Sequence, residues 1–384
     1  MATETETETG ARYGERFGWL DRSLALTCAG SLAVAGLAGL IQVSYGTFSM
    51  SVFQAWSAVL DPLVWTNPGV IVSFLFGDGL AESLGLATEV DLPKETLIVW
   101  NIRLPRVLVA AFVGFNLAIS GAIFQAVTRN ELASPFILGV SSGAGFAVLV
   151  TLVLVPTFAA FLPLTAALGG TLAFLVVYAI AWQGGTSPVR LVLAGVIVGT
   201  VLNSLQTALF FFAGDIGTVQ AAIAWTTGSL TGVDWEQVRT VWPATVLVVL
   251  PGLVLGARQL NVLLLGEGTA SALGMRVERT RFLLSALAIV AAAASVAVAG
   301  IVGFVGLIVP HAVRVLVGGD HKRLLVGCAF LGPALLVGAD LGARLFFEVV
   351  FASPTQLPVG IVTGLVGGPY FLYLMRKRQS LGEL

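Results

Sequence analysis

The stretch from Arg258 to Arg281, RQLNVLLLGEGTASALGMRVERTR, decides the fold because it is the longest polar interruption in the second half of the chain. One apolar span precedes it at 241–256 and another follows it at 282–299, so the stretch lies at a membrane surface. Arginines near both of its ends indicate the cytoplasmic surface. We therefore expect a cytoplasmic loop that contacts a soluble partner.

The composition excludes most classes of soluble protein. Of the 384 residues, 57% are hydrophobic and 11% are charged, whereas an ordinary soluble domain carries roughly a quarter charged residues. An all-α, polytopic membrane protein is the expected class. The formal charge of -1 gives no basic excess to suit nucleic acid. Cys28 and Cys328 both fall inside apolar spans, where small buried side chains rather than a disulfide are expected.

Windows of about 20 apolar residues predict ten transmembrane helices in a single domain at 23–378. The predicted spans are 23–45, 104–126, 136–156, 162–182, 189–213, 240–257, 281–299, 303–317, 324–343 and 358–375. Most of the 20 lysines and arginines fall on the inside when both termini are cytoplasmic, which favours that topology. Residues 1–22 are expected to form a disordered cytoplasmic tail and 379–384 a C-terminal tail.

The segment 46–100 is assigned to the outer surface. Its apolar stretch 69–77 is too short to cross a bilayer. Short helices on the outer surface are therefore expected there, without a separate soluble domain.

Small residues at four-residue spacing indicate where helices pack in a membrane, because close backbone approach replaces the hydrophobic effect there. Two such stripes are interpreted as plain helix packing: Gly114, Ala118 and Ala122, and Gly360, Gly364 and Gly368. A further stripe changes from glycine to polar groups along one face: Gly195, Gly199, Asn203 and Thr207. Amides in hydrocarbon need a partner or water, so Asn203 and its neighbour Gln206 are predicted to face another helix or a water-lined pathway.

Ionisable residues within the spans are few. The main case is Asp340 with Arg344, which are spaced i,i+4 and are expected to form a pair near the outer interface. An ion-coupled secondary transporter is an alternative class, but such transporters usually keep carboxylates or broken helices at the midplane. The absence of a convincing carboxylate there indicates that energy for any transport comes from elsewhere.

Two features invite an enzymatic interpretation. The run from Gly139 to Gly143 matches the nucleophile pattern G-x-S-x-G around Ser141, and His311 lies near the same predicted membrane face. A membrane-embedded serine hydrolase is therefore a second alternative. The pattern is diagnostic only on a strand-turn-helix, whereas here it opens a membrane helix, so no catalytic residue is expected. No zinc motif and no phosphate-loop lysine motif is present, so neither a metal site nor intrinsic ATP hydrolysis is predicted.

Four ordered stretches resemble the membrane permease subunit of the iron-siderophore, haem and vitamin B12 (cobalamin) ABC importers. They are NIRLPRVLVAAFVGFNLAISGAIFQAVTRNELASPFILGVSSGAG at 101–145, LGEGTASALGMRVERTR at 265–281, GFVGLIVPHAVRVLVGGDHKRLL at 303–325, and ADLGARL at 339–345 with LPVGIVTGLVGGPYFLYLMRK at 357–377. The resemblance implies the type II ABC importer permease fold, with ten helices per subunit, in the cell (plasma) membrane.

The resemblance also implies the partners. Such permeases pair as homodimers, bind two cytoplasmic ATPase subunits and receive substrate from an external binding protein. This chain would then bind no cofactor itself, since ATP and Mg belong to the partner ATPase. Cobalamin and ferric siderophores are the leading substrates, with haem behind them.

Site residues follow from the same resemblance. The pathway wall is the fifth helix, which carries the polar stripe of Asn203 and Thr207. Residues implied to couple to the ATPase are Gly266, Ala270, Leu273, Gly274, Met275, Arg276 and Arg279. Those implied to dock the binding protein are Arg103, Arg106 and Arg344. A cytoplasmic gate is implied at Asn130, Leu132, Thr186 and Ser187. The chain departs from the family at Glu131, where proline is usual, and in the greater length of 61–88.

Overall fold

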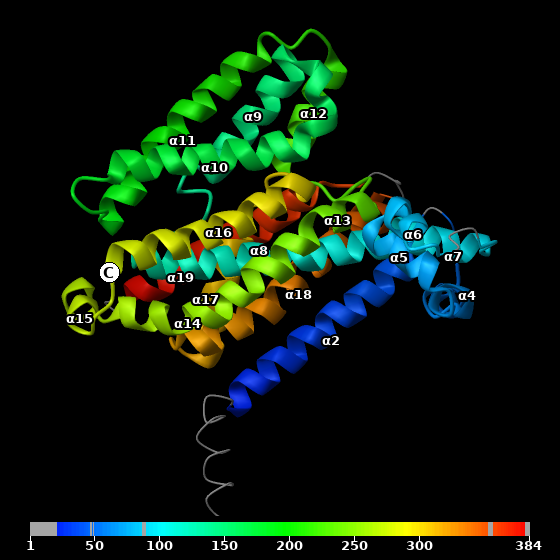
Figure 1. The fold of residues 1–384 in the computed structure, drawn as a ribbon, viewed down its shortest axis with the longest axis horizontal. Helices are drawn as coiled ribbons and strands as arrows, with labels where there is room; N and C mark the ends of the chain where they lie inside the picture. Colours follow the sequence, from blue (N-terminus) through cyan, green and yellow to red (C-terminus); the bar gives the residue numbers. More distant parts are fainter. Residues whose placement is uncertain (1–20, 47, 49, 87–89, 352–355, 381–384) are drawn as a thin grey trace, which may run out of the picture.

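The computed structural model describes residues 21–46, 48, 50–86, 90–351 and 356–380. The predicted tails at 1–20 and 381–384 lie outside the described residues. Within the described part the chain is a bundle of helices without a β-sheet, and the long helices run along the long axis of the molecule (Figure 1). The all-α prediction is confirmed.

Seven helical stretches are long and apolar enough to cross a membrane. They are Arg22–Ser44 (α2), Lys94–Thr128 (α7, the π-helix η1 and α8), Pro156–Ala181 (η2 and α10), Pro188–Phe210 (α11), Trp235–Leu264 (α13, the π-helix η3 and α14), Val277–Ala299 (α16) and His321–Phe346 within α18 (His321–Phe351). The other three predicted spans are shorter apolar helices: Val140–Leu154 (α9), Val305–Val317 (α17) and Val359–Tyr373 within α19 (Val359–Ser380). All ten predicted positions are thus helical, while the count of ten crossings stays a prediction.

The segment after α2 forms short helices, as predicted. They are α3 (Val52–Val59), α4 (Pro62–Trp65), α5 (Pro68–Phe76) and α6 (Asp78–Ser83). Aromatic rings hold this segment on the bundle, because Phe74 stacks on Trp100 at 5.3 Å and on Trp235 at 5.4 Å between ring centroids. Arg239 adds hydrogen bonds to the carbonyl of Phe74 at 3.0 Å and that of Ser73 at 2.7 Å. The segment 52–83 therefore packs on η1 (Val99–Arg103) and on α13.

The core of the bundle is α8, with 72% of its most apolar window buried. Glycine makes this possible where α8 meets its neighbours. A Cβ atom on Gly114 would lie 2.3 Å from the carbonyl oxygen of Gly332 in α18, and one on Gly121 would lie 1.8 Å from that of Gly306 in α17. Both distances are far inside van der Waals contact, so the backbones touch directly. This is the packing role predicted for the Gly114 stripe.

The stripe on α19 behaves differently from its prediction. Gly360 packs against the carbonyl oxygen of Thr227, 1.8 Å from where a Cβ would lie, but Gly364 and Gly368 face open space. The packing interpretation is therefore correct only for Gly360 within this chain.

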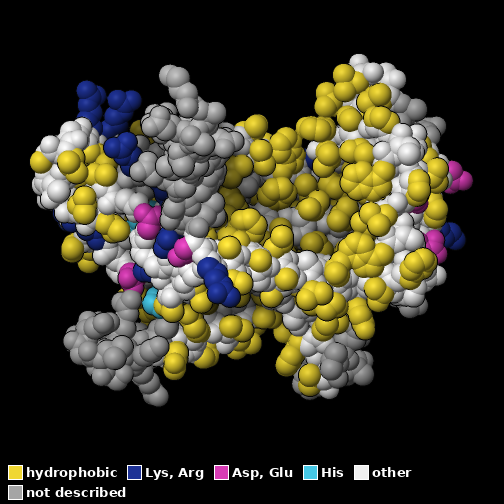
Figure 2. All heavy atoms as spheres, turned by 90° about the horizontal axis from the view of Figure 1, so that it is seen from below, with side chains coloured by type: hydrophobic (Ala, Val, Ile, Leu, Met, Phe, Trp, Pro, Cys, Tyr) yellow, Lys and Arg dark blue, Asp and Glu magenta, His cyan; other side chains and the backbone are white. Residues whose placement is uncertain are grey.

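The stretch from Arg258 to Arg281 is also more helical than its polarity suggests. Helix α14 continues to Leu264, so Arg258 belongs to that helix, and only residues 265–276 form the connection that contains α15 (Glu267–Ala272). Polar side chains do not end a helix that extends beyond the bilayer, because water can form hydrogen bonds with them there. Figure 2 shows charged side chains gathered toward the two ends of one face, with hydrophobic and uncharged side chains between them.

Candidate functional site

One face of α11 combines close packing with exposed polar groups. Gly195 packs on the carbonyl oxygen of Ile137, 2.3 Å from where a Cβ would lie, and Gly199 lies 3.4 Å by the same measure from the Ser142 hydroxyl. Farther along the helix, Asn203 and Thr207 are exposed. Along the predicted pathway stripe, the two glycines therefore pack against neighbouring segments, whereas Asn203 and Thr207 are exposed.

The two amides on α11 find different surroundings. Gln206 is buried, and its amide donates to the carbonyl of Ser142 in α9 at 3.1 Å and to Oδ1 of Asn203 at 3.0 Å. The amide N–H groups of Asn203 find no acceptor among the described residues. Gln206 thus faces another helix, and Asn203 presents free donors on an exposed face within a membrane-length helix.

The connection at 265–276 projects a short helix away from the bundle. Gly266 and Gly274 bracket α15 with φ of 107° and 82°, a backbone region that favours glycine. Ala270 is buried, whereas the Leu273 side chain is 64% exposed. Arg276 and Arg279 are exposed as well. A hollow of about 420 Å³ beside them is lined by Arg258, Gln259, Val262, Leu273, Gly274, Met275, Arg276 and Thr280.

The loop before α11 is bound to this connection. Thr186 is buried, and both its backbone N–H and its hydroxyl donate to the Glu278 carboxylate at 2.9 Å. Arg281, which is 1% exposed, pairs with Glu278 at 2.9 Å and with Glu267 at 2.6 Å, and it also donates to Thr186. Ser187 caps α11 by accepting from the backbone N–H of Arg190 at 3.2 Å. The predicted gate residues Thr186 and Ser187 therefore link α16 to α11.

The loop after α8 has its own contacts. Asn130 Oδ1 accepts from the backbone N–H of Leu132 at 2.9 Å, and the Leu132 side chain is 43% exposed. Arg129 adopts φ of 47° and donates to the carbonyl of Leu263, at the end of α14, at 3.0 Å. Glu131 lies 3.5 Å from Arg314 and 3.8 Å from His311, both on α17. The glutamate that departs from the resembled family therefore joins this loop to α17.

The three arginines predicted to dock the binding protein line one hollow of about 320 Å³. Arg103 and Arg106 are buried, and each is already engaged within the chain. Arg103 donates to the carbonyls of Val43 at 2.6 Å and Ser44 at 2.9 Å, where α2 ends. Arg344 donates to the carbonyl of Tyr45 at 3.1 Å. The structure thus brings the predicted docking residues together but gives each a structural partner.

The predicted pair of Asp340 with Arg344 is wrong, because Asp340 is fully buried and pairs with Arg106 instead. The Arg106 guanidinium donates two hydrogen bonds of 2.8 Å to the Asp340 carboxylate, from Nε to Oδ2 and from Nη2 to Oδ1. Arg106 also donates to Gln356 at 2.8 Å, and Gln42 donates to Asp340. A pattern search along one helix misses this pair because the two residues stand 234 positions apart.

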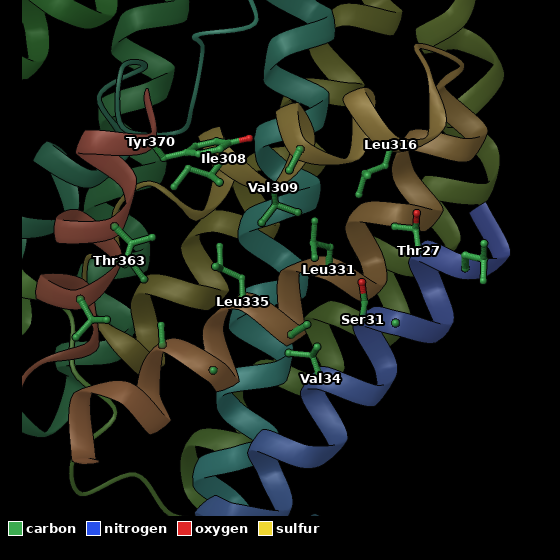
Figure 3. A pocket seen from close by; sticks show the side chains of 18 residues that line it. Thr27, Ser31, Val34, Ile308, Val309, Leu316, Leu331, Leu335, Thr363 and Tyr370 are labelled. Carbon is green, nitrogen blue, oxygen red and sulfur yellow. The ribbon is translucent and has the colours of Figure 1, made fainter. Parts of the chain in front are cut away.

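A hollow larger than these two lies elsewhere. A groove of about 870 Å³ runs between α2, α17, α18 and α19, and Figure 3 shows mostly aliphatic side chains turned into it. Its hydroxyls are few, and that of Thr27 donates to the backbone of its own helix at 2.8 Å. Figure 1 places α2 and α11 on opposite sides of α8, so this groove is separate from the polar face of α11.

The enzymatic alternative lacks its structural context. Ser141 is buried in the first turn of α9, which starts at a left-handed Gly139 with φ of 82°, and no strand precedes it in the described chain. His311 lies beside Glu131. Among the described residues no group of His, Cys, Asp and Glu could hold a metal ion.

Comparison with known proteins gives a consistent result. Residues 32–377 match the profile of the FecCD transport family. The Fe(3+)-citrate import system permease protein YfmD of Bacillus subtilis is 40% identical over 81% of this chain and 94% of its own length. The cobalamin import system permease protein BtuC of Halobacterium salinarum is 45% identical over 74% of each chain.

A haem system and a solved structure add to these. The hemin transport system permease protein HmuU of Yersinia pestis is 39% identical over 73% of this chain and 84% of its own length. A metal-chelate type ABC transporter solved in an inward-facing conformation superposes with a TM-score of 0.73 at 27% identity, covering 91% of this chain and 98% of that one.

Proposed function

The chain belongs to the FecCD transport family, and on that premise we propose that two copies of it enclose the path by which a metal chelate enters the cell. It is a multi-pass membrane permease subunit of an ABC importer, and it is not itself an enzyme. The predicted resemblance is confirmed at this level. The second copy, the external binding protein, the plasma membrane and the cytoplasmic termini belong to the proposal.

The exposed polar face of α11 carries the proposal for the pathway. Free amide donors in contact with lipid are unfavourable by about 1–3 kcal/mol when unpaired, so Asn203 needs water or a polar partner. A second copy that presents its own α11 would enclose Asn203 and Thr207 in a shared, water-filled space. Gly195 would hold the helix on the segment before α9, and Gly199 would hold it on α9, at the wall of this space.

The connection at 265–276 suits a partner that hydrolyses ATP. The exposed Leu273 is an apolar side chain close in sequence to two exposed arginines, Arg276 and Arg279. An apolar centre with a polar rim is typical of protein interfaces. We assign α15 and the hollow beside it to the ATPase contact. The ATPase would supply ATP and Mg, and this chain would hold neither.

The outer hollow suits an acidic group of a binding protein. Arg103, Arg106 and Arg344 line it together with Gln356, so positive potential converges there even though each guanidinium has an internal partner. Pairs of this kind guide encounter and orientation more than they add affinity. Of the three, Arg344 is the least buried and is the residue that we assign to the direct contact.

The substrate is proposed as cobalamin or a ferric chelate, with haem third. The relatives' names include iron(III)-citrate, cobalamin and hemin permeases at similar identity, which supports the class of metal chelates. The exposed side chains of α11 are amides, hydroxyls and aliphatics without a fixed charge, a lining that suits passage of a large chelate without tight binding.

The test is uptake by the reconstituted importer. The chain is purified with its ATPase, placed in vesicles and given radiolabelled cobalamin, ferric siderophore, ferric citrate or haem with the binding protein. We expect uptake of one of these chelates. This uptake should require ATP on the side of the vesicle membrane where the ATPase is bound, and it should stop when ATP is replaced by a non-hydrolysable analogue. Uptake driven by an ion gradient without the ATPase would refute the proposal. In a chain free of other cysteines, Asn203→Cys should cross-link two copies, whereas the exposed Val254→Cys on α14 should not.

A further inference from the structure

We propose that Arg281 transmits the movement of α15 to the gate loop at 183–187, so that the two move as one rigid unit. The proposal rests on the proposed function and assigns to this arginine a positioning role in coupling ATP hydrolysis to gating.

The contacts form an unbroken path. Glu267 is the first residue of α15, and its carboxylate accepts from Arg281 at 2.6 Å. Arg281, on α16, reaches Thr186 through its hydroxyl at 3.1 Å and its carbonyl. Thr186 precedes Ser187, which caps α11. The side chains of Arg281 and Thr186 and the peptide bond from Thr186 to Ser187 therefore connect α15, assigned to the ATPase contact, with α11, assigned to the pathway.

Burial makes this path stiff. Arg281 is the largest fully buried side chain among the described residues, and its charge is balanced by two carboxylates. Glu278 holds the loop a second time, because its two carboxylate oxygens accept from the N–H and the hydroxyl of Thr186. A desolvated charge cannot leave its partners without exposing uncompensated charge, so the loop follows α15 and α16 instead of sliding past them.

The other gate loop is attached differently. Arg129 touches only the backbone end of α14, at Leu263, while Glu131 ties the same loop to α17. The end of α14 is therefore tied to one gate loop, and α15 together with the start of α16 is tied to the other; only the second link contains a fully buried guanidinium. This asymmetry singles out Arg281 rather than Arg129.

The experiment measures chelate imported per ATP hydrolysed in the reconstituted complex. Arg281→Gln removes the buried guanidinium that joins Glu267 to Thr186 and leaves the exposed surface of α15 unchanged. We expect ATP hydrolysis within about twofold of wild type and uptake per ATP at least tenfold lower. Glu278→Gln, at a carboxylate of α16 that is 36% exposed, should act in the same direction. Glu236→Gln, at a first-turn glutamate of α13, is the matched control and should leave the ratio unchanged.

A rescue arm separates coupling from folding. In a chain whose native cysteines are replaced by alanine, Thr186→Cys with Glu278→Cys removes the side-chain bonds and should lower uptake per ATP. Joining the two thiols with a short bifunctional reagent should restore it, because the loop and α16 would again move together. Loss of the remaining uptake on cross-linking, or a normal ratio of uptake to ATP hydrolysis in Arg281→Gln, would overturn the proposal. Absence of ATP-driven uptake by wild type would instead refute the proposed function.

Discussion

Replacing Arg106 by methionine should reveal how strongly the outer ends of α2, α8 and α18 depend on one buried ion pair. The side chains of Arg106 and Asp340 are 9% and 0% exposed, and two bonds of 2.8 Å join them. Arg106→Met keeps an unbranched apolar stem but removes the guanidinium, which leaves the carboxylate with Gln42 as its remaining partner among those hydrogen bonds.

The expected loss in the free energy of unfolding is about 3–5 kcal/mol, which is the penalty for removing one partner of a buried pair. At about 1.4 kcal/mol per factor of ten, this corresponds to a rise of roughly two to three and a half orders of magnitude in the unfolding constant. Arg279→Met serves as the control, because that arginine is exposed and surface substitutions usually stay within about 0.5 kcal/mol.

The double variant Arg106→Met with Asp340→Leu should recover most of this loss, because apolar replacement of a whole buried pair is often neutral. About 1–3 kcal/mol should remain, since the amide of Gln42 then loses its acceptor. Adding Gln42→Leu should remove that remainder. Unfolding in mixed micelles, followed by circular dichroism, gives the free energies of wild type, the control and the three variants. A loss below about 1 kcal/mol in Arg106→Met, or a double variant that is no more stable than Arg106→Met, would refute this account of the pair.

Three further predictions concern packing, coupling and pH. Gly121→Ala should lower the thermal midpoint in detergent sharply, because overpacking against Gly306 costs about 1–3 kcal/mol or more, while Gly30→Ala, which meets open space, should not. Leu273→Asp should weaken binding of the ATPase subunit at least tenfold in surface plasmon resonance with the fold intact; unchanged binding would remove Leu273 from the contact. The pKa of Asp215 is lowered because the backbone N–H and then the hydroxyl of Thr218 donate to it. Its cap on α12 (Ile216–Thr227) is therefore fully present above its ordinary pKa of 3.8 and lost only as the pH falls through the lowered value. Amide exchange of α12 relative to Asp215→Ala should show constant protection from pH 8 to 5.

The helices could be predicted from the sequence because a membrane imposes one strong local rule. Backbone groups in lipid must bond within the segment, so apolar windows mark the helices without knowledge of the fold. The rule says nothing about where a helix ends in water, which is why α14 runs on to Leu264 and the connection is shorter than its polarity predicts. The same limit left the crossing count of α9, α17 and α19 undecided.

Side-chain partners were predicted poorly wherever they are distant in sequence. Local spacing joined Asp340 to Arg344, but the partner is Arg106 on α8. Likewise Thr186 and Arg281 were assigned to different loops, and only the tertiary structure shows that they touch. The one sequence signal for such contacts was Glu131, whose departure from the family's proline is explained by its pairing with Arg314.

The two kinds of arginine in this chain indicate how a permease can be rigid and movable at once. At one end of the bundle, Arg103 and Arg106 bind backbone and carboxylate groups of α2 and α18, which fixes three helices together. At the other end, Arg281 binds a short helix and a loop. The two sets of buried links involve different helices, and the weaker contacts between them are where bending is easiest. A force on α15 would therefore reach α11 through the loop at 183–187, while α2, α8 and α18 stay joined to one another.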